Sequence, residues 1–539
     1  MRKILYSVIV LAFLSCSKEQ ADTIVTNAKI YTVNEDFDVT ESFAIKEGKI
    51  IAVGTASEIN KQFEAEQIID ADGKTIFPGL IDAHCHFYRL GMQQQKVDVS
   101  GTKSYDEVLD KIVAFQKENN VSFITGRGWD QNDWEIKEFP TKEKLDKLFP
   151  KTPVAITRID GHALLVNQAA IDLANITTET KVSGGEIIKE NGKITGILID
   201  AAMDFISPPI PTVSESANGL LAAEKITLSY GLTTVDDAGL NQNIIELIDS
   251  LQQNNKLKSR IYAMVSGDNQ KQIDYYIDKG IYKTDKLNVR SFKVYGDGAL
   301  GSRGAAMRKS YTDRENHFGA LIYSPERYTE IAQQIAASEF QMNTHAIGDS
   351  ANTWLLKAYK KVLKNQTDRR WRIEHAQIIS EEDFALFKNI FPSVQPTHAT
   401  SDMYWAEDRV GKKRMKGAYA FKDLLDTYGK VALGTDFPVE KVSPFLTFYA
   451  ATSRKDLEGF PDGGFQIENA LTREETLKGM TIWAAYSNFE ENEKGSIEVG
   501  KFADFVILDQ DIMTVPLDKT PNTKVLSTYI SGERVYNSN

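Results

Sequence analysis

Alternating apolar and polar positions occupy the two ends of the chain. Residues 22–77 contain T-I-V-T-N-A-K-I-Y-T-V, S-F-A-I-K-E-G-K-I-I-A-V-G and Q-I-I-D-A-D-G-K-T-I-F. This period of two predicts β-strands, and Glu47-Gly48 is a turn signal between two of them. Residues 485–539 repeat the pattern in K-F-A-D-F-V-I-L-D and V-L-S-T-Y-I-S-G-E-R-V-Y. Because neither segment has enough strands to bury a face alone, we predict that both ends together build one β-sandwich.

The middle of the chain, residues 78–484, follows another pattern, in which short β-rich runs alternate with stretches of helical periodicity. Eight such units in sequence favour an α/β fold with a closed parallel (β/α)₈ barrel, the TIM barrel. An open doubly wound sheet is the alternative. The predicted strands lie near residues 79–84, 232–238, 260–265, 289–295, 341–345, 370–375, 393–398 and 431–436.

The gap between the first and second predicted strands is unusually long. Residues 98–225 must form an insertion that leaves the barrel through its first βα loop. Since βα loops lie on the C-terminal face of a barrel, we expect the insertion to lie over any active site there. Its stretches G-R-G-W-D-Q-N-D-W (126–134) and I-D-G-H-A (159–163) are the parts most suited to touch a substrate.

The first residues have the pattern of a secretory signal. Arg2 and Lys3 precede an apolar stretch over residues 4–14, which is too short to span a bilayer, and F-L-S-C follows. This resembles a bacterial lipoprotein signal, which predicts a signal peptide over residues 1–15, lipidation of Cys16 and a tether to residue 21. The protein would then be lipid-anchored in the cell envelope. An uncleaved anchor helix is the alternative.

The overall charge limits the partners. Formal net charge is -12, and no Lys/Arg run offers a basic face, which argues against a nucleic-acid partner. We therefore expect a small-molecule substrate, with membrane contact only through the lipid anchor, and a homodimer is compatible with the sequence. After cleavage Cys85 would be the free thiol, and we predict that it faces the covering helices as a core residue.

Polar residues that bind metals fall at the ends of the predicted strands. In G-L-I-D-A-H-C-H-F, two histidines one residue apart share a face of an extended strand. This H-x-H motif is weak evidence alone, but in a barrel the strand ends converge on one rim, and imidazole and carboxylate groups suit Zn²⁺ and similar ions. The candidates at strand ends are His84, His86, His345, His375 and Asp436, with Lys293 inside the fourth strand and His398 at the end of the seventh.

Lys293 needs a separate explanation, because a bare ammonium beside a metal cation would be repelled. In S-F-K-V-Y, Phe292 and Val294 would face the helices, whereas Lys293 and Tyr295 would face the interior. Reaction of the amine with CO₂ would give a carbamate, an anionic oxygen ligand able to bridge two metals. The alternative is a lysine that binds a substrate carboxylate.

At family level the chain resembles the amidohydrolase superfamily, and more narrowly its family 3 branch, which includes proteins similar to N-substituted formamide deformylase. The resemblance covers about residues 22–535 and implies a (β/α)₈ barrel, with one or two divalent metals, usually zinc. It is carried by F-P-G-L-I-D-A-H-C-H, G-R-G-W-D-Q-N-D-W, R-I-D-G-H-A-L-L-V-N, F-K-V-Y-G-D-G-A-L-G-S-R-G-A, N-T-H-A-I-G-D, R-I-E-H-A-Q, A-L-G-T-D-F-P-V-E and G-S-I-E-V-G-K-F-A-D-F-V-I-L-D.

The same resemblance implies roles for individual residues. Metal ligands would be His84, His86, carbamylated Lys293, His345 and His375, with Asp436 as the catalytic carboxylate. Asp297 and Arg303 in D-G-A-L-G-S-R and His162 in I-D-G-H would line the substrate site. Two further substrate-binding candidates do not come from the resemblance. His398 is a candidate by its place at the end of the seventh predicted strand, where a supporting role is equally open, and Trp129 suits an apolar or aromatic substrate group or simply packs the loops over the site.

The function that follows is metal-dependent hydrolysis of a C–N bond in an amide or N-substituted formamide. A deaminase of the same superfamily is one alternative. Those with one metal typically lack the strand-four lysine and use a glutamate near strand five, where this chain has Asp349. A non-catalytic, ligand-binding envelope lipoprotein is the other alternative, since a fold does not guarantee an activity.

Overall fold

The structure is a computed structural model that describes residues 18–182, 185–364, 366 and 368–538. The predicted signal peptide and Cys16 lie outside these residues, so lipid anchoring stays a prediction. Within the described ranges, no helix combines the length and apolarity of a membrane span.

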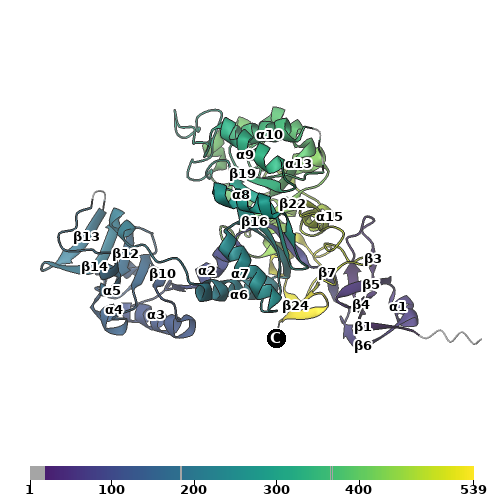
Figure 1. Cartoon of the computed structure of the whole chain (residues 1–539), viewed down its shortest axis with the longest axis horizontal. Coiled ribbons are helices and arrows are strands. Elements are labelled where there is room, and N and C mark those ends of the chain that lie inside the picture. The colour runs from purple at the N-terminus through teal and green to yellow at the C-terminus, as the bar shows by residue number, and fades with distance from the viewer. Residues whose placement is uncertain (1–17, 183–184, 365, 367, 539) are drawn as a thin grey trace, which may run out of the picture.

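The centre of the molecule is a nearly closed barrel of eight parallel strands (Figure 1). All eight predicted strands are present, and the predicted α/β barrel is confirmed. They are β8 (Leu80–Cys85), β15 (Leu232–Leu240), β16 (Arg260–Ser266), β18 (Leu287–Tyr295), β19 (Gln341–Ala346), β20 (Arg372–His375), β21 (Phe391–Val394) and β22 (Ala432–Leu433).

Two strands end earlier than the sequence pattern predicts. Strand β21 stops at Val394, and Pro396 begins helix α11 (Pro396–Asp402), since the fixed φ of proline suits a first helical turn. His398 therefore lies on a helix and not on a strand. Strand β22 has only two residues, so Asp436 lies in the loop beyond it.

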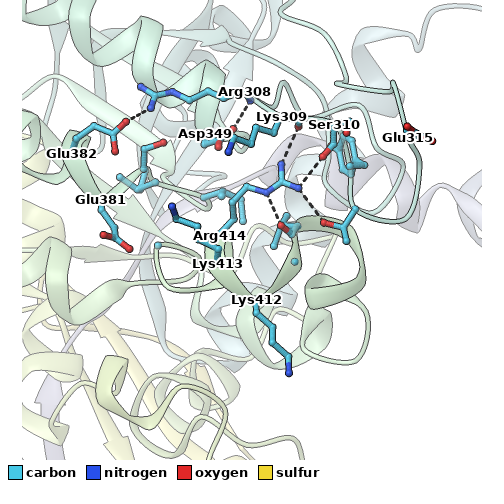
Figure 2. A pocket seen from close by; sticks show the side chains of 18 residues that line it. Arg308, Lys309, Ser310, Glu315, Asp349, Glu381, Glu382, Lys412, Lys413 and Arg414 are labelled. Carbon is cyan, nitrogen blue, oxygen red and sulfur yellow. Dashed lines mark hydrogen bonds and ion pairs between the residues drawn. The ribbon is translucent and has the colours of Figure 1, made fainter.

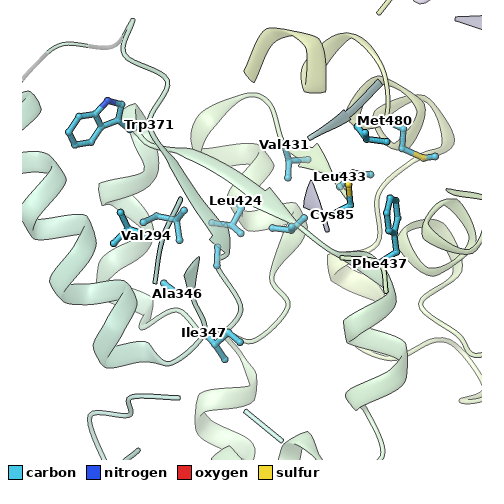
Figure 3. Packing of buried hydrophobic residues seen from close by; sticks show 14 of the residues in the cluster. Cys85, Val294, Ala346, Ile347, Trp371, Leu424, Val431, Leu433, Phe437 and Met480 are labelled. Carbon is cyan, nitrogen blue, oxygen red and sulfur yellow. The ribbon is translucent and has the colours of Figure 1, made fainter. Parts of the chain in front are cut away.

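The outer face of the barrel packs against its helices. Phe292 and Val294 are fully buried in the main apolar cluster, whereas Lys293 between them points inward, as strand alternation predicts. Cys85 lies in the same cluster with Leu433 and Phe437 (Figure 3). The thiol is buried, and burial raises its pKa well above the ordinary value, so this cysteine is a core residue.

Both chain ends contribute strands to one sheet, as predicted. Its order is β25-β24-β23-β7-β2-β3, and β23 pairs antiparallel with β7. A second sheet, β5-β4-β1-β6, completes this region. The first sheet contains β2 (Lys29–Tyr31), β3 (Val39–Thr40), β7 (Thr75–Pro78), β23 (Phe505–Leu508), β24 (Val525–Ile530) and β25 (Glu533–Asn537). The second contains β1 (Glu19–Thr26), β4 (Ser42–Lys46), β5 (Lys49–Gly54) and β6 (Phe63–Asp70).

The insertion after β8 is a separate mixed sheet with its own apolar clusters. It leaves the barrel through α2 (Phe87–Gln94) and returns through α6 (Val213–Ser229), which pack on each other. Figure 1 shows this sheet standing to one side of the barrel. Its strands are β9 (Lys96–Asp98), β10 (Ile124–Trp129), β11 (Val154–Arg158), β12 (Ala163–Val166), β13 (Gly185–Glu190) and β14 (Lys193–Asp200).

Candidate metal centre

The two histidines of the H-x-H motif reach the same carboxylate. His84 is the last residue of β8 that faces the barrel interior, and His86 is the first residue after the strand. His86 Nδ1 donates to the Ala238 carbonyl oxygen at 3.0 Å, which leaves Nε2 free to face the centre. The Nε2 atoms of His84 and His86 lie 3.8 and 3.3 Å from Asp436 Oδ1. The prediction that both imidazoles share one face is therefore correct.

Asp436 is held in place by the seam of the barrel, the region where the last strand, β22, meets the first strand, β8. Its backbone N–H donates to the His84 carbonyl oxygen at 2.8 Å. Next to it, the buried Asp82 carboxylate accepts from the Thr435 N–H at 3.0 Å and from its hydroxyl at 2.6 Å. Asp436 itself has φ 61°, a left-handed conformation that costs about 1–3 kcal/mol in a non-glycine residue. Contacts across the seam hold this strained residue against the histidines.

Gly434 permits this close approach. A Cβ atom at this position would lie 2.5 Å from the His84 nitrogen and 2.9 Å from Asp82 Oδ1. We expect Gly434→Ala to lower the free energy of unfolding by about 1–3 kcal/mol, because overpacking forces the backbone to move. Chemical denaturation measures this, with Gly301→Ala as the control, since its Cβ would meet only the Trp405 ring at 3.4 Å. Equal effects of the two substitutions would contradict the packing argument.

Two further histidines converge from β19 and β20. The ring centroids of His345 and His375 lie 4.5 Å apart, and that of His375 lies 4.8 Å from that of His84. Gln395 Oε1 lies 2.6 Å from His375 Nδ1 and so accepts its hydrogen. His375 has φ 75°, which turns its side chain toward the interior although Ile373 on the same strand faces the core. Strict alternation would have placed both outside.

Lys293 completes the ring of side chains from inside β18. It is 1% exposed, and its Nζ lies 3.1 Å from His84 Nε2. Among the described residues, no carboxylate oxygen lies within 4.0 Å of this Nζ. Burial lowers the pKa of Lys293 to about 8, against the opposing effect of the Glu374 and Asp436 carboxylates.

The buried polar atoms of this cluster fit a divalent metal. His345 Nε2 and Asp436 Oδ1 are buried without a hydrogen-bond partner among the described residues, which is costly unless a ligand satisfies them. Burial, and then the Lys293 ammonium, lower the pKa of His84 to about 4 and of His345 to about 3. These rings are therefore neutral near pH 7, the form that binds metals.

Asp436 belongs to two groups of three candidate ligands. It joins His84 and His86 in one, and His375 and His398 in the other, and the ligand atoms of each group lie within 4.8 Å of one another. Nitrogen and oxygen donors of this kind suit zinc and similar ions. The barrel therefore brings together all six residues predicted as ligands or catalytic carboxylate. Four come from strands β8, β18, β19 and β20, and the other two, His86 and Asp436, lie just beyond β8 and β22.

His398 contacts the Asp436 carboxylate from helix α11. Its Nε2 lies 3.3 Å from Asp436 Oδ2 and its Nδ1 3.2 Å from Glu440 Oε1. Burial opposes protonation of His398, but hydrogen bonds to the two carboxylates raise its pKa to about 10. Glu440 was not predicted, because no pattern in V-A-L-G-T-D-F-P-V-E separates it from a surface residue.

The family follows from this site and from comparison with known proteins. A family model described as the amidohydrolase family matches residues 67–536, which is most of the chain. The chain belongs to the amidohydrolase family. Members of this family are metal-dependent hydrolases, which agrees with the cluster of histidines and carboxylates.

Named relatives extend over nearly the whole amidohydrolase. Protein LONG AFTER FAR-RED 3 of Arabidopsis thaliana is 31% identical over 96% of this chain and 92% of its own length. N-substituted formamide deformylase of Arthrobacter pascens is 25% identical, over 95% of this chain and 98% of its own. An uncharacterized metal-dependent hydrolase of Pyrococcus horikoshii OT3 has a crystal structure 27% identical in sequence, with a TM-score of 0.75 over 92% of this chain and 99% of that one.

Two residues of the D-G-A-L-G-S-R stretch organise loops of the amidohydrolase. Asp297 is 2% exposed and accepts from three backbone N–H groups, those of Ala306, Ile347 and Gly348, at 2.8–3.0 Å. Its carboxylate therefore joins the loops after β18 and β19, and its Oδ1 also lies 3.6 Å from His345 Nε2. Asp297 thus lies beside the candidate metal-binding residues, and its contact with substrate stays a prediction. Arg303 is on the same rim, where its Nη2 pairs with Asp313 at 2.7 Å.

The structure does not bring the two candidates of the insertion to the metal-binding residues. Trp129 is fully buried among apolar residues of the insertion sheet and donates to the Ile156 carbonyl oxygen at 2.7 Å. It packs the insertion, so its predicted substrate contact is corrected. His162 is exposed and pairs with Asp200 at 2.8 Å. The expected position of the insertion over the site is likewise not seen, because this sheet stands to one side (Figure 1).

One cavity of the amidohydrolase lies outside the candidate metal centre. It measures about 880 Å³ and is lined by loops after β18 and β20 and by helix α12 (Ala406–Met415), with no candidate ligand among its lining residues. Figure 2 shows Arg414 donating to neighbouring backbone groups and Arg308 paired with Glu382.

Sequence reasoning missed the residues that support the ligands. Asp82, Glu374 and Gln395 contact Thr435, His84 and His375. Asp82 and Glu374 stand two residues and one residue before a predicted ligand, so polar positions inside apolar strands were the available signal. Gln395 had no such signal.

Proposed function

We propose that this amidohydrolase cleaves a C–N bond in an amide or N-substituted formamide. The observation that carries the proposal is the position of Asp436, whose two carboxylate oxygens face histidines on opposite sides. A carboxylate so placed can take a proton at one position and return it at another. The formamide deformylase among the relatives supports this choice of substrate class.

A divalent cation, for which we propose zinc in one or two sites, would supply a Lewis acid that polarises the carbonyl and acidifies water. His84, His86, His345 and His375 would hold it, together with Asp436. We further propose that Lys293 is carbamylated, because its buried Nζ faces His84 without a carboxylate partner nearby. The carbamate would replace a repelled ammonium with an anionic oxygen donor.

The residues of the chain then divide the proton transfers. Asp436 would accept a proton from the attacking water and deliver it to the leaving nitrogen, which departs as an amine. The hydrogen bond from His398 and the nearby histidine rings oppose the effect of burial and hold the pKa of Asp436 well below its ordinary range. His398 would also orient this carboxylate, since it is held on its other side by Glu440.

Metal content and turnover test the proposal together. We expect purified protein to bind at least one equivalent of zinc or manganese, and a chelator to abolish hydrolysis of a panel of N-acyl and N-formyl amines. Amine release is measured for each substrate, and ammonia release from aminopurines tests the deaminase alternative. Much less than one equivalent of metal would favour the ligand-binding alternative, and ammonia release alone would favour the deaminase.

A further inference from the structure

A line of buried charged side chains runs from the metal centre into the barrel. Glu374 Oε2 lies 2.6 Å from His84 Nδ1, and neither side chain is exposed. On its other side, Glu374 Oε1 lies 3.3 Å from Arg372 Nε. Arg372 Nη1 in turn lies 3.1 Å from Asp236 Oδ2, whose other oxygen accepts from Asn488 at 2.7 Å. Four ionisable groups are thus linked without contact with solvent.

Packing does not explain why these groups are buried. A buried ion pair is often no more stabilising than apolar residues of the same volume, because both charges lose their hydration. The line does, however, end on His84, whose Nε2 faces Lys293 Nζ at 3.1 Å and Asp436 Oδ1 at 3.8 Å. The contact between Glu374 and His84 Nδ1 therefore determines which nitrogen of His84 faces the candidate metal centre.

We propose that Glu374 is the positioning residue for His84. It accepts the Nδ1 hydrogen and so keeps Nε2 as the metal-binding atom, while Arg372 holds the Glu374 carboxylate in place. Carboxylates that accept from ligand histidines in this way fix the ring orientation and strengthen metal binding. This inference rests on the metal-dependent function proposed above.

The backbone at the end of β20 turns two consecutive side chains toward the barrel interior. Glu374 and His375 are consecutive, yet both side chains face the interior, where one contacts His84 and the other Gln395. The positive φ of His375, 75°, makes this possible at the end of the strand. One strand thereby supplies a ligand and the group that orients a ligand from another strand.

Metal affinity measured by competition with a chelator tests the inference. We expect Glu374→Ala to weaken metal binding by roughly 10- to 100-fold. Glu374→Gln should bind between Glu374→Ala and wild type, because its amide oxygen still accepts the Nδ1 hydrogen. Glu382→Gln is the matched control, since Glu382 pairs with Arg308 on the surface, and its affinity should equal that of wild type.

Thermal unfolding with and without metal separates positioning from a purely structural role. A positioning role predicts that the metal raises the Tm of the Glu374 variants less than that of wild type. Equal metal-induced increases in Tm, or affinities within twofold of wild type, would overturn the inference. If Glu374→Ala does not fold, the isosteric Glu374→Gln decides by the same measurements. Failure of wild type itself to bind metal would instead overturn the proposed function.

Discussion

Replacing Asp436 with asparagine should lower kcat by about 10²–10⁴-fold, the usual contribution of a general base. The amide cannot accept the proton of the attacking water, although it has nearly the same shape and its oxygen can still accept a hydrogen bond from His398. The measurement is steady-state turnover on the best substrate of the panel, with metal content determined on the same sample.

The metal determination is needed because Asp436 also belongs to both groups of candidate ligands. If metal stays bound and turnover remains within about tenfold of wild type, Asp436 is not the general base. Asp426→Asn is the control, since Asp426 is exposed and pairs with Lys422 on the surface. It should leave both turnover and metal content unchanged.

Replacing Lys293 with methionine should remove both metal and activity. Methionine has a similar length and suits the buried position, so the fold is expected to survive. It cannot form a carbamate, however, and we expect metal affinity and kcat each to fall on the order of 100-fold or more, beyond the range known for supporting residues. Lys360→Met, on the exposed face of helix α10 (Asp349–Leu363), is the control.

Carbon dioxide distinguishes a carbamate from a plain lysine. Wild-type protein stripped of metal and reloaded without CO₂ should regain little activity, and added bicarbonate should restore it. Carbamylation adds CO₂ to the amine with release of one proton, so reloading should also be slower at low pH. Full recovery without bicarbonate would show that Lys293 acts as an amine, for example toward a substrate carboxylate.

The eight strands could be predicted because each is a short apolar run, as expected for strands whose outer face packs against helices. Recognising such a run requires only the local sequence pattern. The same holds for the inward direction of Lys293 between Phe292 and Val294. The strand ends also indicated the candidate ligands, since a parallel barrel brings all C-terminal ends to one rim. These inferences needed no knowledge of the contacts between side chains.

Three features of the site could not be read in this way. His375 and Asp436 face the centre through positive φ angles, and no sequence pattern announces such a conformation in a non-glycine residue. Trp129 was a substrate-binding candidate because it lies in the G-R-G-W-D-Q-N-D-W stretch of an insertion expected over the site, but the insertion has a core of its own that buries it. Burial of an aromatic residue depends on partners far away in the sequence.

The sequence by itself determined the barrel, the composite sheet of both chain ends and the set of candidate metal-binding side chains, because period-two patterns and strand ends are local properties. Only the tertiary structure decided how these side chains are oriented. Glu374 contacts His84, Asp82 contacts Thr435, and His398 contacts Asp436. The partners in each pair come from different strands, helices or loops, so these hydrogen bonds form only when the barrel closes. The orientation and the protonation state of the side chains at the candidate metal centre therefore depend on the closed barrel.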